Sequence, residues 1–482
     1  MTVVNHFLQG FFRAESVAVV GATNNPLKTN YRLTENLVTL NYTGRVYPVN
    51  PKEKEIFGLK AYPRLGDIPG EIDLVVIAVR PALVMDVVLE CGDIGIKRLV
   101  IVTGGFSESG EPGRKLQKRV SDFIKARGIR TLGPNTLTPV NTATGLAISY
   151  FQLKKLKRGS LSFAFQSGFY EPKMNWIFSH LGVAKMLDMG NKIDINEVDA
   201  LEYLAQDPET QVIAMHIESL QGDGRKFFKI LNQVSWEKPT IILKTGHTSA
   251  GSIAASSHTG SMARENDAIF DGLIRQTAAI RAQNLEEFFD LAKAFELLDL
   301  PSGDRLAIIT MSGGEGVMAT DASEKYGLKL ARFTERTSQK LQAASPLWEI
   351  PLNPFDGGVV IQFHMSDPAT FFETLTFIPE DENVDCAIMQ MPPNFFESGF
   401  SAPDNLDESQ PLIAQEFIER LIKIKGAGKP IAVWRNTLDN REAELMAMIE
   451  SRNLAVFQSA DRAVKCLAAM VRFRRRRSGV NS

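Results

Sequence analysis

Short runs rich in β-branched residues alternate with longer stretches of mixed polar and apolar residues along most of the chain. In the first part these runs cover residues 16–20, 45–48, 74–79, 98–102 and 130–132. Such runs are typical of strands buried on both faces, and the stretches between them are long enough for helical crossovers. The pattern predicts parallel strands joined by helices.

The same alternation begins again twice further along the chain. A second set of strands is predicted at 160–165, 183–187, 211–217 and 240–243, and a third at 305–310, 328–332, 385–389, 430–434 and 454–457. The sequence therefore predicts an α/β protein of three consecutive doubly wound domains, covering residues 1–145, 146–299 and 300–482. Each domain is long enough to bury a core of its own.

Composition narrows the class of protein. The 482 residues include 54 basic and 56 acidic side chains, so the net charge does not favour nucleic acid and no nucleic-acid partner is expected. Only the run 472–477 is locally basic. The three cysteines are far apart and lack CxxC spacing, which argues against a disulfide framework and against a bound metal. The apolar runs are too short to span a bilayer, and no signal peptide is apparent. We expect a cytoplasmic protein that does not enter membranes.

The first predicted strand leads into a loop suited to an anion. Residues 16–20 run into Gly21 and the segment 22–26, and a helix is expected to begin near Tyr31. Loop amides and a helix N-terminus that converge there predict a phosphate-sized site. Only Gly21 of a G-x-G-x-x-G pattern is present, and the second strand ends at Asn50 without an acidic residue, which disfavours NAD. A plain strand-to-helix turn without a ligand is the other interpretation.

Five segments of this first part resemble a known family. Residues 21–23 (Gly-Ala-Thr), 47–51 (Tyr-Pro-Val-Asn-Pro), 73–76, 104–108 and 133–135 (Gly-Pro-Asn) follow the order and spacing of the CoA-binding domain of NDP-forming acyl-CoA synthetases. That superfamily includes succinyl-CoA synthetase, and the resemblance implies a Rossmann-like fold for residues 1–145. The chain departs from the family at Leu27 and Asn30, where glycines are usual, and at Thr136, where a cysteine is usual. The CoA contacts that the resemblance implies are Gly21, Thr23, Lys28, Asn50, Val79, Arg80, Thr103 and Asn135.

A histidine lies in a segment of small residues. Twelve of the fifteen residues 249–263 are Gly, Ala, Ser or Thr, and they surround His258. An imidazole can attack phosphorus near neutral pH and pass the phosphoryl group onward, although a surface loop that happens to hold a histidine has the same composition. The segment Ser257-His258-Thr259-Gly260-Ser261 resembles the family's phosphorylated histidine segment, and the resemblance identifies His258 as the phosphoryl carrier.

Two further segments are candidates for the same site. Glu218 follows the predicted strand 211–217, where it can accept a hydrogen bond from a carrier imidazole, and it aligns with the family's glutamate in that role. A merely solvated carboxylate is the alternative.

Gln166, Ser167 and Gly168 follow another strand, and their amides can receive phosphate at a helix start. Phe169, Tyr170 and Pro172 replace smaller residues of the family, which implies an altered acyl pocket. Residues 190–194 are expected to shape the sheet edge.

The resemblance continues to about residue 470. Residues 311–316 and 353–356 resemble the third, flavodoxin-like domain of ADP-forming acetyl-CoA synthetases. The three domains would then be the CoA-binding domain, a flavodoxin-like phosphohistidine ligase domain, and a second flavodoxin-like ligase domain with the basic tail.

No ATP-grasp region is recognisable within the 482 residues. The resemblance therefore implies the α subunit of an ADP-forming acyl-CoA synthetase of the acetate–CoA ligase type. It would use CoA and a small carboxylic acid, with ATP/ADP and Mg²⁺ on a separate ATP-grasp β subunit, in an α2β2 hetero-oligomer. The alternatives are a non-catalytic CoA-responsive regulatory or scaffold subunit, and a dinucleotide-dependent oxidoreductase, which Asn50 disfavours.

Overall fold

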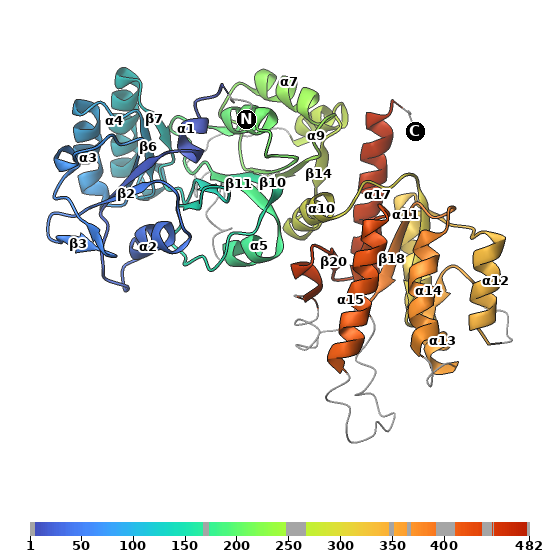
Figure 1. Ribbon diagram of the computed structural model, residues 1–482. Coiled ribbons are helices and arrows are strands. Elements are labelled where there is room, and N and C mark those ends of the chain that lie inside the picture. Colours follow the sequence, from blue (N-terminus) through green and yellow to red (C-terminus); the bar gives the residue numbers. More distant parts are fainter. Residues whose placement is uncertain are drawn as a thin grey trace. The chain divides into compact units, whose positions relative to one another are not determined.

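The computed structural model describes residues 5–166, 173–246, 267–346, 351–363, 368–391, 410–435, 446 and 448–479. The chain divides into two compact units, Met1–Phe288 and Phe289–Ser482. The first unit holds a five-stranded and a seven-stranded sheet, and the second holds a six-stranded sheet (Figure 1). The predicted doubly wound α/β class is confirmed, and the domain divisions near residues 146 and 300 remain predictions.

The first sheet is parallel and has the order β2-β1-β5-β6-β7. The order in which the chain forms the strands changes direction between β1 and β5. In doubly wound sheets, ligands bind at such a point, outside the carboxyl ends of the strands. The strands are β1 (Ser16–Val20), β2 (Arg45–Val49), β5 (Leu74–Ile77), β6 (Arg98–Ile101) and β7 (Arg130–Leu132). A separate hairpin of β3 (Glu55–Ile56) and β4 (Leu59–Lys60) lies between β2 and β5 in the sequence. The helices are α1 (Gln9–Phe12), α2 (Tyr31–Thr39), α3 (Pro81–Asp93) and α4 (Glu111–Arg127).

Both faces of this sheet are buried. Val17 and Val19 point into one apolar cluster, and the alternate residues Ala18 and Val20 point into another. Because successive side chains of a strand point to opposite faces, a sheet covered on both sides needs apolar residues at every position. The first cluster also includes Ile213 of the second sheet, so one core is shared by the two sheets of this unit.

The second sheet has the order β14-β13-β12-β10-β11-β8-β9. Strands β10 to β14 pair in parallel, whereas β8 runs antiparallel to β11 and to β9. The strands are β8 (Val140–Asn141), β9 (Leu146–Ala147), β10 (Arg158–Phe165), β11 (Val183–Asp188), β12 (Val212–Ile217), β13 (Thr240–Lys244) and β14 (Ile280–Ala282). The helices are α5 (Met174–His180), α6 (Glu197–Gln206), α7 (Gly224–Val234), α9 (Asp267–Arg275) and α10 (Leu285–Leu297), which contains the boundary between the units.

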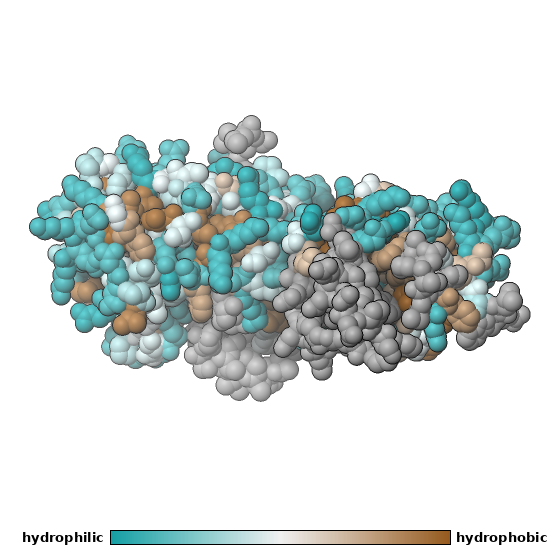
Figure 2. Space-filling model, turned by 60° about the horizontal axis from the view of Figure 1, so that its bottom comes forward, coloured by the Kyte–Doolittle hydropathy of each residue, from teal (hydrophilic) through white to brown (hydrophobic). Residues whose placement is uncertain are grey.

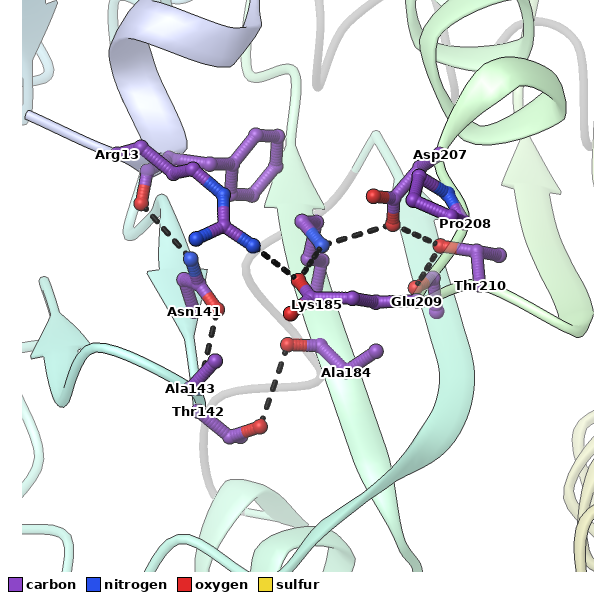
Figure 3. A network of polar contacts seen from close by, with 12 residues as sticks. Arg13, Asn141, Thr142, Ala143, Ala184, Lys185, Asp207, Pro208, Glu209 and Thr210 are labelled. Carbon is purple, nitrogen blue, oxygen red and sulfur yellow. Dashed lines mark hydrogen bonds and ion pairs between the residues drawn. The ribbon is translucent and has the colours of Figure 1, made fainter. Parts of the chain in front are cut away.

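A buried polar network joins the N-terminal segment to the second sheet (Figure 3). Lys185 on β11 is fully buried, and its Nζ lies 2.7 Å from Asp207 Oδ2 and 2.6 Å from Glu209 Oε2. Arg13, which precedes β1, places Nη2 2.9 Å from the same Glu209 oxygen. A buried ammonium is tolerated only when its charge is paired in this way, so the network fixes how the segment before β1 meets the second sheet.

The second unit contains a parallel sheet of the order β16-β15-β18-β19-β20, with β17 also pairing β15. Its strands are β15 (Arg305–Thr310), β16 (Lys329–Leu330), β17 (Phe355–Asp356), β18 (Cys386–Gln390), β19 (Ile431–Trp434) and β20 (Val456–Phe457). Its helices are α11 (Gly313–Tyr326), α12 (Glu335–Ala344), α13 (Gly357–Phe363), α14 (Pro368–Glu380), α15 (Gln410–Gly426) and α17 (Ala460–Arg477).

The basic run at the C-terminus is helical. It forms the end of α17, which packs beside α11. Phe473 is buried in this run, and Arg475 Nη2 lies 2.6 Å from Asp304 Oδ2. Part of the run is therefore used for packing within the second unit.

Hydrophilic residues cover much of the described surface in Figure 2, with smaller hydrophobic areas between them. Within the described ranges, no helix is both long and apolar enough to cross a membrane. Isolated apolar side chains at a surface are normal, so the view by itself does not indicate an interface.

Candidate active site

Gln166 and Glu218 meet at the carboxyl edge of the second sheet. Gln166 directly follows β10 and Glu218 directly follows the neighbouring parallel strand β12. Gln166 is 2% exposed, and its Oε1 accepts hydrogen bonds from the backbone nitrogens of Glu218 at 3.0 Å and Ser219 at 3.2 Å. The side chain that opens the predicted phosphate segment thereby fixes the backbone that carries the predicted orienting carboxylate.

A buried ion pair supports this edge. Lys192 Nζ lies 3.0 Å from Gln166 Oε1, 2.9 Å from Glu197 Oε2 and 2.6 Å from the backbone oxygen of Ser219. The Lys192 and Glu197 side chains are both fully buried. The other Glu197 oxygen accepts hydrogen bonds from the backbone nitrogens of Gln221 and Gly222, each at 2.7 Å. The segment after Glu218 is thus held from both sides, by Lys192 and by Glu197.

His216 on β12 lies in the sheet interior. Burial lowers its pKa to about 3, and its Nε2 lies 2.9 Å from Thr245 Oγ1. Its imidazole is therefore neutral across the physiological range.

Asp188 is a second acidic residue at this edge, and it was not predicted from the sequence. It ends β11, it is fully buried, and burial raises its pKa to about 7, with the nearby charge of Glu218 adding to the rise. Its carboxylate accepts hydrogen bonds from the backbone nitrogens of Gly190 at 3.0 Å and Leu137 at 3.2 Å. The signal that identified Glu218, an acidic residue at the end of a predicted strand, applies equally to Asp188.

The remaining residues predicted for this site lie outside the described ranges. Ser167 and Gly168 fall in 167–172, and His258 falls in 247–266. Their positions relative to Glu218 remain predictions. Among the residues that the structure does describe, no group of three or more His, Cys, Asp and Glu side chains could hold a metal ion.

The residues predicted for CoA lie at the carboxyl edge of the first sheet. They follow five strands, with Gly21 and Thr23 after β1, Asn50 after β2, Val79 and Arg80 after β5, Thr103 after β6 and Asn135 after β7. Lys28 lies in the loop between β1 and α2. Ligands of doubly wound sheets bind at this edge, so the fold gathers all eight predicted positions where a ligand is expected.

Hydrogen bonds connect these strand ends. Thr103 Oγ1 donates to the backbone oxygen of Val79 at 2.7 Å, and the backbone nitrogen of Asn135 donates to the backbone oxygen of Thr103 at 3.1 Å. Asn50 Nδ2 donates to the backbone oxygen of Ala22 at 2.8 Å. Lys28, Arg80 and Asn135 remain exposed, so two cationic side chains and one amide are accessible to an anionic ligand. This donor set fits the phosphates of CoA.

Glu53 is another residue that was not predicted from the sequence. Its Oε1 lies 3.2 Å from Thr23 Oγ1, and its Oε2 accepts a hydrogen bond from Asn24 Nδ2 at 2.8 Å. The first loop is therefore fastened to the segment after β2 by a carboxylate. Asn30, at a position where the family usually has glycine, donates its side-chain amide to the backbone oxygen of Gly21, so this departure strengthens the loop.

Two protein-family models match parts of the chain. The model of the CoA binding domain matches residues 15–141, and the model of the succinyl-CoA ligase like flavodoxin domain matches residues 158–295. Together they define a CoA ligase of the succinyl-CoA synthetase class, as the sequence resemblance predicted.

Relatives and solved structures narrow the class. The chain is 35% identical to an acetate–CoA ligase (ADP-forming) II subunit alpha of Pyrococcus furiosus, covering 88% of this chain and 89% of that one. It is 34% identical to acetate–CoA ligase (ADP-forming) II of Archaeoglobus fulgidus, covering 98% of this chain and 67% of the relative. The dinucleotide forming acetyl-coenzyme A synthetase 1 of Ca. Korarchaeum cryptofilum, solved with phosphate and ADP, superposes with a TM-score of 0.84 at 28% identity, covering 99% of this chain and 98% of that one. The chain belongs to the family of ADP-forming acyl-CoA ligases.

Proposed function

We propose that this chain is the α subunit of an ADP-forming acyl-CoA synthetase, which converts a carboxylic acid, CoA and ATP into acyl-CoA, ADP and phosphate. Membership of the family supports the reaction class. Relatives that are named as alpha subunits support a subunit role. In this proposal the nucleotide and Mg²⁺ bind to a separate ATP-grasp β subunit, and the two chains form an α2β2 assembly. The solved relative with bound phosphate and ADP supports phosphoryl transfer to a nucleotide.

The observation that carries the proposal is the Glu218 carboxylate at the carboxyl edge of the second sheet, on backbone that Gln166 holds. In the proposed mechanism Glu218 accepts a hydrogen bond from one ring nitrogen of His258. That contact fixes the tautomer and leaves the other ring nitrogen free to attack phosphorus. The amides of Gln166, Ser167 and Gly168 receive the phosphate.

The proposed reaction consists of three steps, two phosphoryl transfers and one acyl transfer. In the synthetic direction a His258 nitrogen attacks the terminal phosphorus of ATP, and ADP leaves. The carboxylate of the acid then attacks the phosphorus of phosphohistidine, which gives an acyl phosphate and restores the imidazole. Finally the CoA thiol, after losing its proton, attacks the acyl carbon and releases phosphate.

CoA is proposed to lie across the carboxyl edge of the first sheet. Lys28 and Arg80 would face its phosphates, and Asn135 offers an exposed amide. Calorimetry with the full chain tests this placement, with CoA and NAD as alternative ligands. We expect heat from CoA and none from NAD, whereas binding of NAD alone would support an oxidoreductase instead.

Phosphorylation of the histidine is tested with radiolabelled acetyl phosphate, or with labelled ATP and the β subunit. We expect an acid-labile, base-stable label that is lost in His258→Ala. Glu218→Gln should slow labelling by about one to three orders of magnitude, as for loss of an orienting or electrostatic group. His180→Ala is the matched control, because His180 ends α5 and its Nδ1 lies 2.9 Å from the backbone oxygen of Trp176. A label that persists in His258→Ala would refute the carrier role.

The acid is identified with a panel. Relatives are named for acetate and for 4-hydroxybutyrate, and one is named a trans-feruloyl-CoA synthase. Rates of ADP release by the chain together with the β subunit, measured with acetate, 4-hydroxybutyrate and ferulate, therefore cover small, hydroxylated and aromatic acids. The acid with the highest kcat/KM defines the substrate class.

A further inference from the structure

Two loops from different sheets are hydrogen-bonded together beside the proposed CoA site. The backbone nitrogen of Asn191 donates to the backbone oxygen of Pro134 at 2.9 Å, and that of Ile193 donates to the backbone oxygen of Gly133 at 3.2 Å. Gly133 and Pro134 immediately precede Asn135, which the proposed function assigns to CoA. The position of Asn135 therefore depends on the segment that follows β11.

Asp188 occupies the centre of this junction. Its Oδ2 accepts a hydrogen bond from the backbone nitrogen of Leu137, in the loop that carries Asn135, and its Oδ1 accepts one from Gly190. Three more hydrogen bonds join its backbone to the same loop, one of them from Thr138 Oγ1 to the backbone oxygen of Asp188 at 3.3 Å. Thr136 Oγ1 lies 2.5 Å from the backbone oxygen of Asp188, and the backbone nitrogen of Asp188 lies 2.6 Å from Thr138 Oγ1.

The charge of this carboxylate can change near neutral pH. Burial raises the pKa of Asp188 to about 7 and the charge of Glu218 adds to the rise, whereas hydrogen bonds from Gly190, Leu137 and the Thr136 hydroxyl oppose it. Ionisable groups on adjoining elements include His216 and Glu218 on or after β12, and Lys192, Asp194 and Glu197 between β11 and the start of α6. Glu108, in the first sheet's domain, accepts a hydrogen bond from Asn191 Nδ2 at 2.6 Å. Lys192 is already paired with Glu197 at 2.9 Å, and burial keeps His216 neutral. No ionisable residue lies in the segment 133–138 or in β8.

The two protonation states of Asp188 differ in the hydrogen bonds that they can accept. An ionised carboxylate accepts both backbone N–H groups through separate oxygens. A protonated carboxyl group turns one oxygen into an O–H donor, and both of these backbone partners are themselves donors. Protonation therefore weakens one of the two contacts, so the ionised form holds the 133–137 loop more firmly.

We propose that Asp188 is a positioning residue for CoA, whose ionised carboxylate fastens the loop that carries Asn135 to the second sheet and thereby strengthens CoA binding. The inference rests on the CoA site of the proposed function. Because the charge of Glu218 acts on Asp188, Asp188 also links the CoA loop electrostatically to the edge of the second sheet where the phosphohistidine is proposed to bind. Because linkage is reciprocal, CoA binding should in turn favour the ionised form of Asp188.

Calorimetric titration of the full chain with CoA between pH 6 and pH 8 tests this role. The affinity of the unmodified protein should rise with pH, by about three- to tenfold more than that of Asp188→Asn, as expected for the net contribution of one hydrogen bond. The amide introduced by Asp188→Asn offers one acceptor oxygen and one donor nitrogen at every pH, as the protonated acid does. Any contribution from the phosphates of CoA is common to all variants and cancels in the comparison.

Asp194→Asn is the matched control. The Asp194 carboxylate also accepts a backbone N–H from the first sheet, at 2.8 Å from Thr131 N, but it is paired with Arg130 Nε at 2.9 Å. Its pH profile should follow that of the unmodified protein. Glu218→Gln provides a test that leaves Asp188 intact. Removing the neighbouring negative charge should shift the midpoint of the pH dependence to lower pH.

The outcomes separate this inference from the proposed function. If the unmodified protein binds no CoA at either pH, the CoA site and the positioning role both fail. If CoA binds but the unmodified protein and Asp188→Asn show the same pH dependence, only the positioning role is overturned. If Asp188→Asn does not fold, an unchanged midpoint in Glu218→Gln overturns the role by itself.

Discussion

The Oε1 atom of Gln166 lies 3.0 Å from the backbone nitrogen of Glu218, although the two residues are 52 positions apart in the chain. This contact joins the start of the segment predicted to receive phosphate to the residue predicted to orient the phosphohistidine. The same oxygen also accepts a hydrogen bond from Lys192, whose charge is balanced by Glu197. One amide side chain therefore connects the ends of β10 and β12 with the buried ion pair beneath them.

Gln166→Ala is expected to impair both stability and phosphoryl transfer. It leaves the buried nitrogens of Glu218 and Ser219 without this acceptor, which should cost about 1–3 kcal/mol of unfolding free energy. Labelling of His258 by acetyl phosphate should slow by about ten- to a hundredfold, because Glu218 loses its support. Gln211→Ala is the control, since Gln211 is exposed just before β12. Urea denaturation and the rate of labelling measure the two effects, and equal results for the two variants would contradict the role of Gln166.

Gly21→Ala is expected to destabilise the first unit more than Gly58→Ala. Both glycines have positive φ, +94° and +75°, so alanine is strained at either position. A Cβ at Gly21 would also lie 2.5 Å from the backbone oxygen of Ala78, whereas a Cβ at Gly58 meets nothing within 4 Å. We expect about 1 kcal/mol for Gly58→Ala and at least twice that for Gly21→Ala. Thermal unfolding with and without CoA compares them, and similar losses would show that the loop relaxes around the methyl group.

The second unit should lose stability in acid through Asp385. Burial by itself would raise the pKa of this carboxyl group, but hydrogen bonds from Arg305 and Ser302 outweigh it and hold the pKa at about 2. A depressed pKa gives stability that is fully present above the unfolded value of about 4 and is lost as pH falls toward 2. The loss should amount to about 2 kcal/mol.

Asp385→Asn tests this pH dependence. It should lower stability at pH 7 and flatten the decline between pH 4 and pH 2, because the titrating group is gone. Hydrogen exchange of peptides that cover β18 follows this unit within the full chain. Asp461→Asn, at a carboxylate whose side chain is 49% exposed, should leave the slope unchanged. A slope in Asp385→Asn equal to that of the unmodified protein would assign the acid sensitivity to other groups.

The isolated chain is expected not to consume ATP. Its sequence contains no G-x-x-x-x-G-K-[ST] phosphate loop, and relatives that align with most of it are named as alpha subunits. ADP formation should therefore appear only when an ATP-grasp subunit is added, and the two chains should then elute together as a hetero-oligomer. Acyl-CoA and ADP produced by the purified chain alone would refute the subunit assignment.

The local pattern of the sequence was enough to predict most strands of the three sheets. Residues 16–20 and 130–132 are strands as predicted, and the helix expected near Tyr31 begins at that residue. Strands buried on both faces need apolar side chains at nearly every position, so a run of consecutive apolar residues is enough to identify them. The same reasoning missed β8, β9, β14 and β17, because strands of two or three residues leave no comparable run of apolar residues.

Strand ends also allowed part of the site to be predicted. Parallel strands place their carboxyl ends along one edge, so Glu218 and the segment that begins at Gln166 could be selected by their position after a strand. The eight residues proposed for CoA were selected by family resemblance, and the structure places them along such an edge. Family resemblance selected His258, Ser167 and Gly168, which lie outside the described residues.

Only the tertiary structure decided which of these groups interact and what charge they carry. The contacts of Gln166 with Glu218, of Lys192 with Gln166, and of Asp188 with Leu137 join residues 52, 26 and 51 positions apart, so no local pattern encodes them. Asp188 and Glu218 both follow the sequence rule of an acidic residue at a strand end. Complete burial raises the pKa of Asp188 to about 7, whereas Glu218 is only partly buried. The sequence determines which residues reach the edge, and the packing around each carboxyl group determines its charge, because the cost of ionisation depends on the surroundings that folding creates.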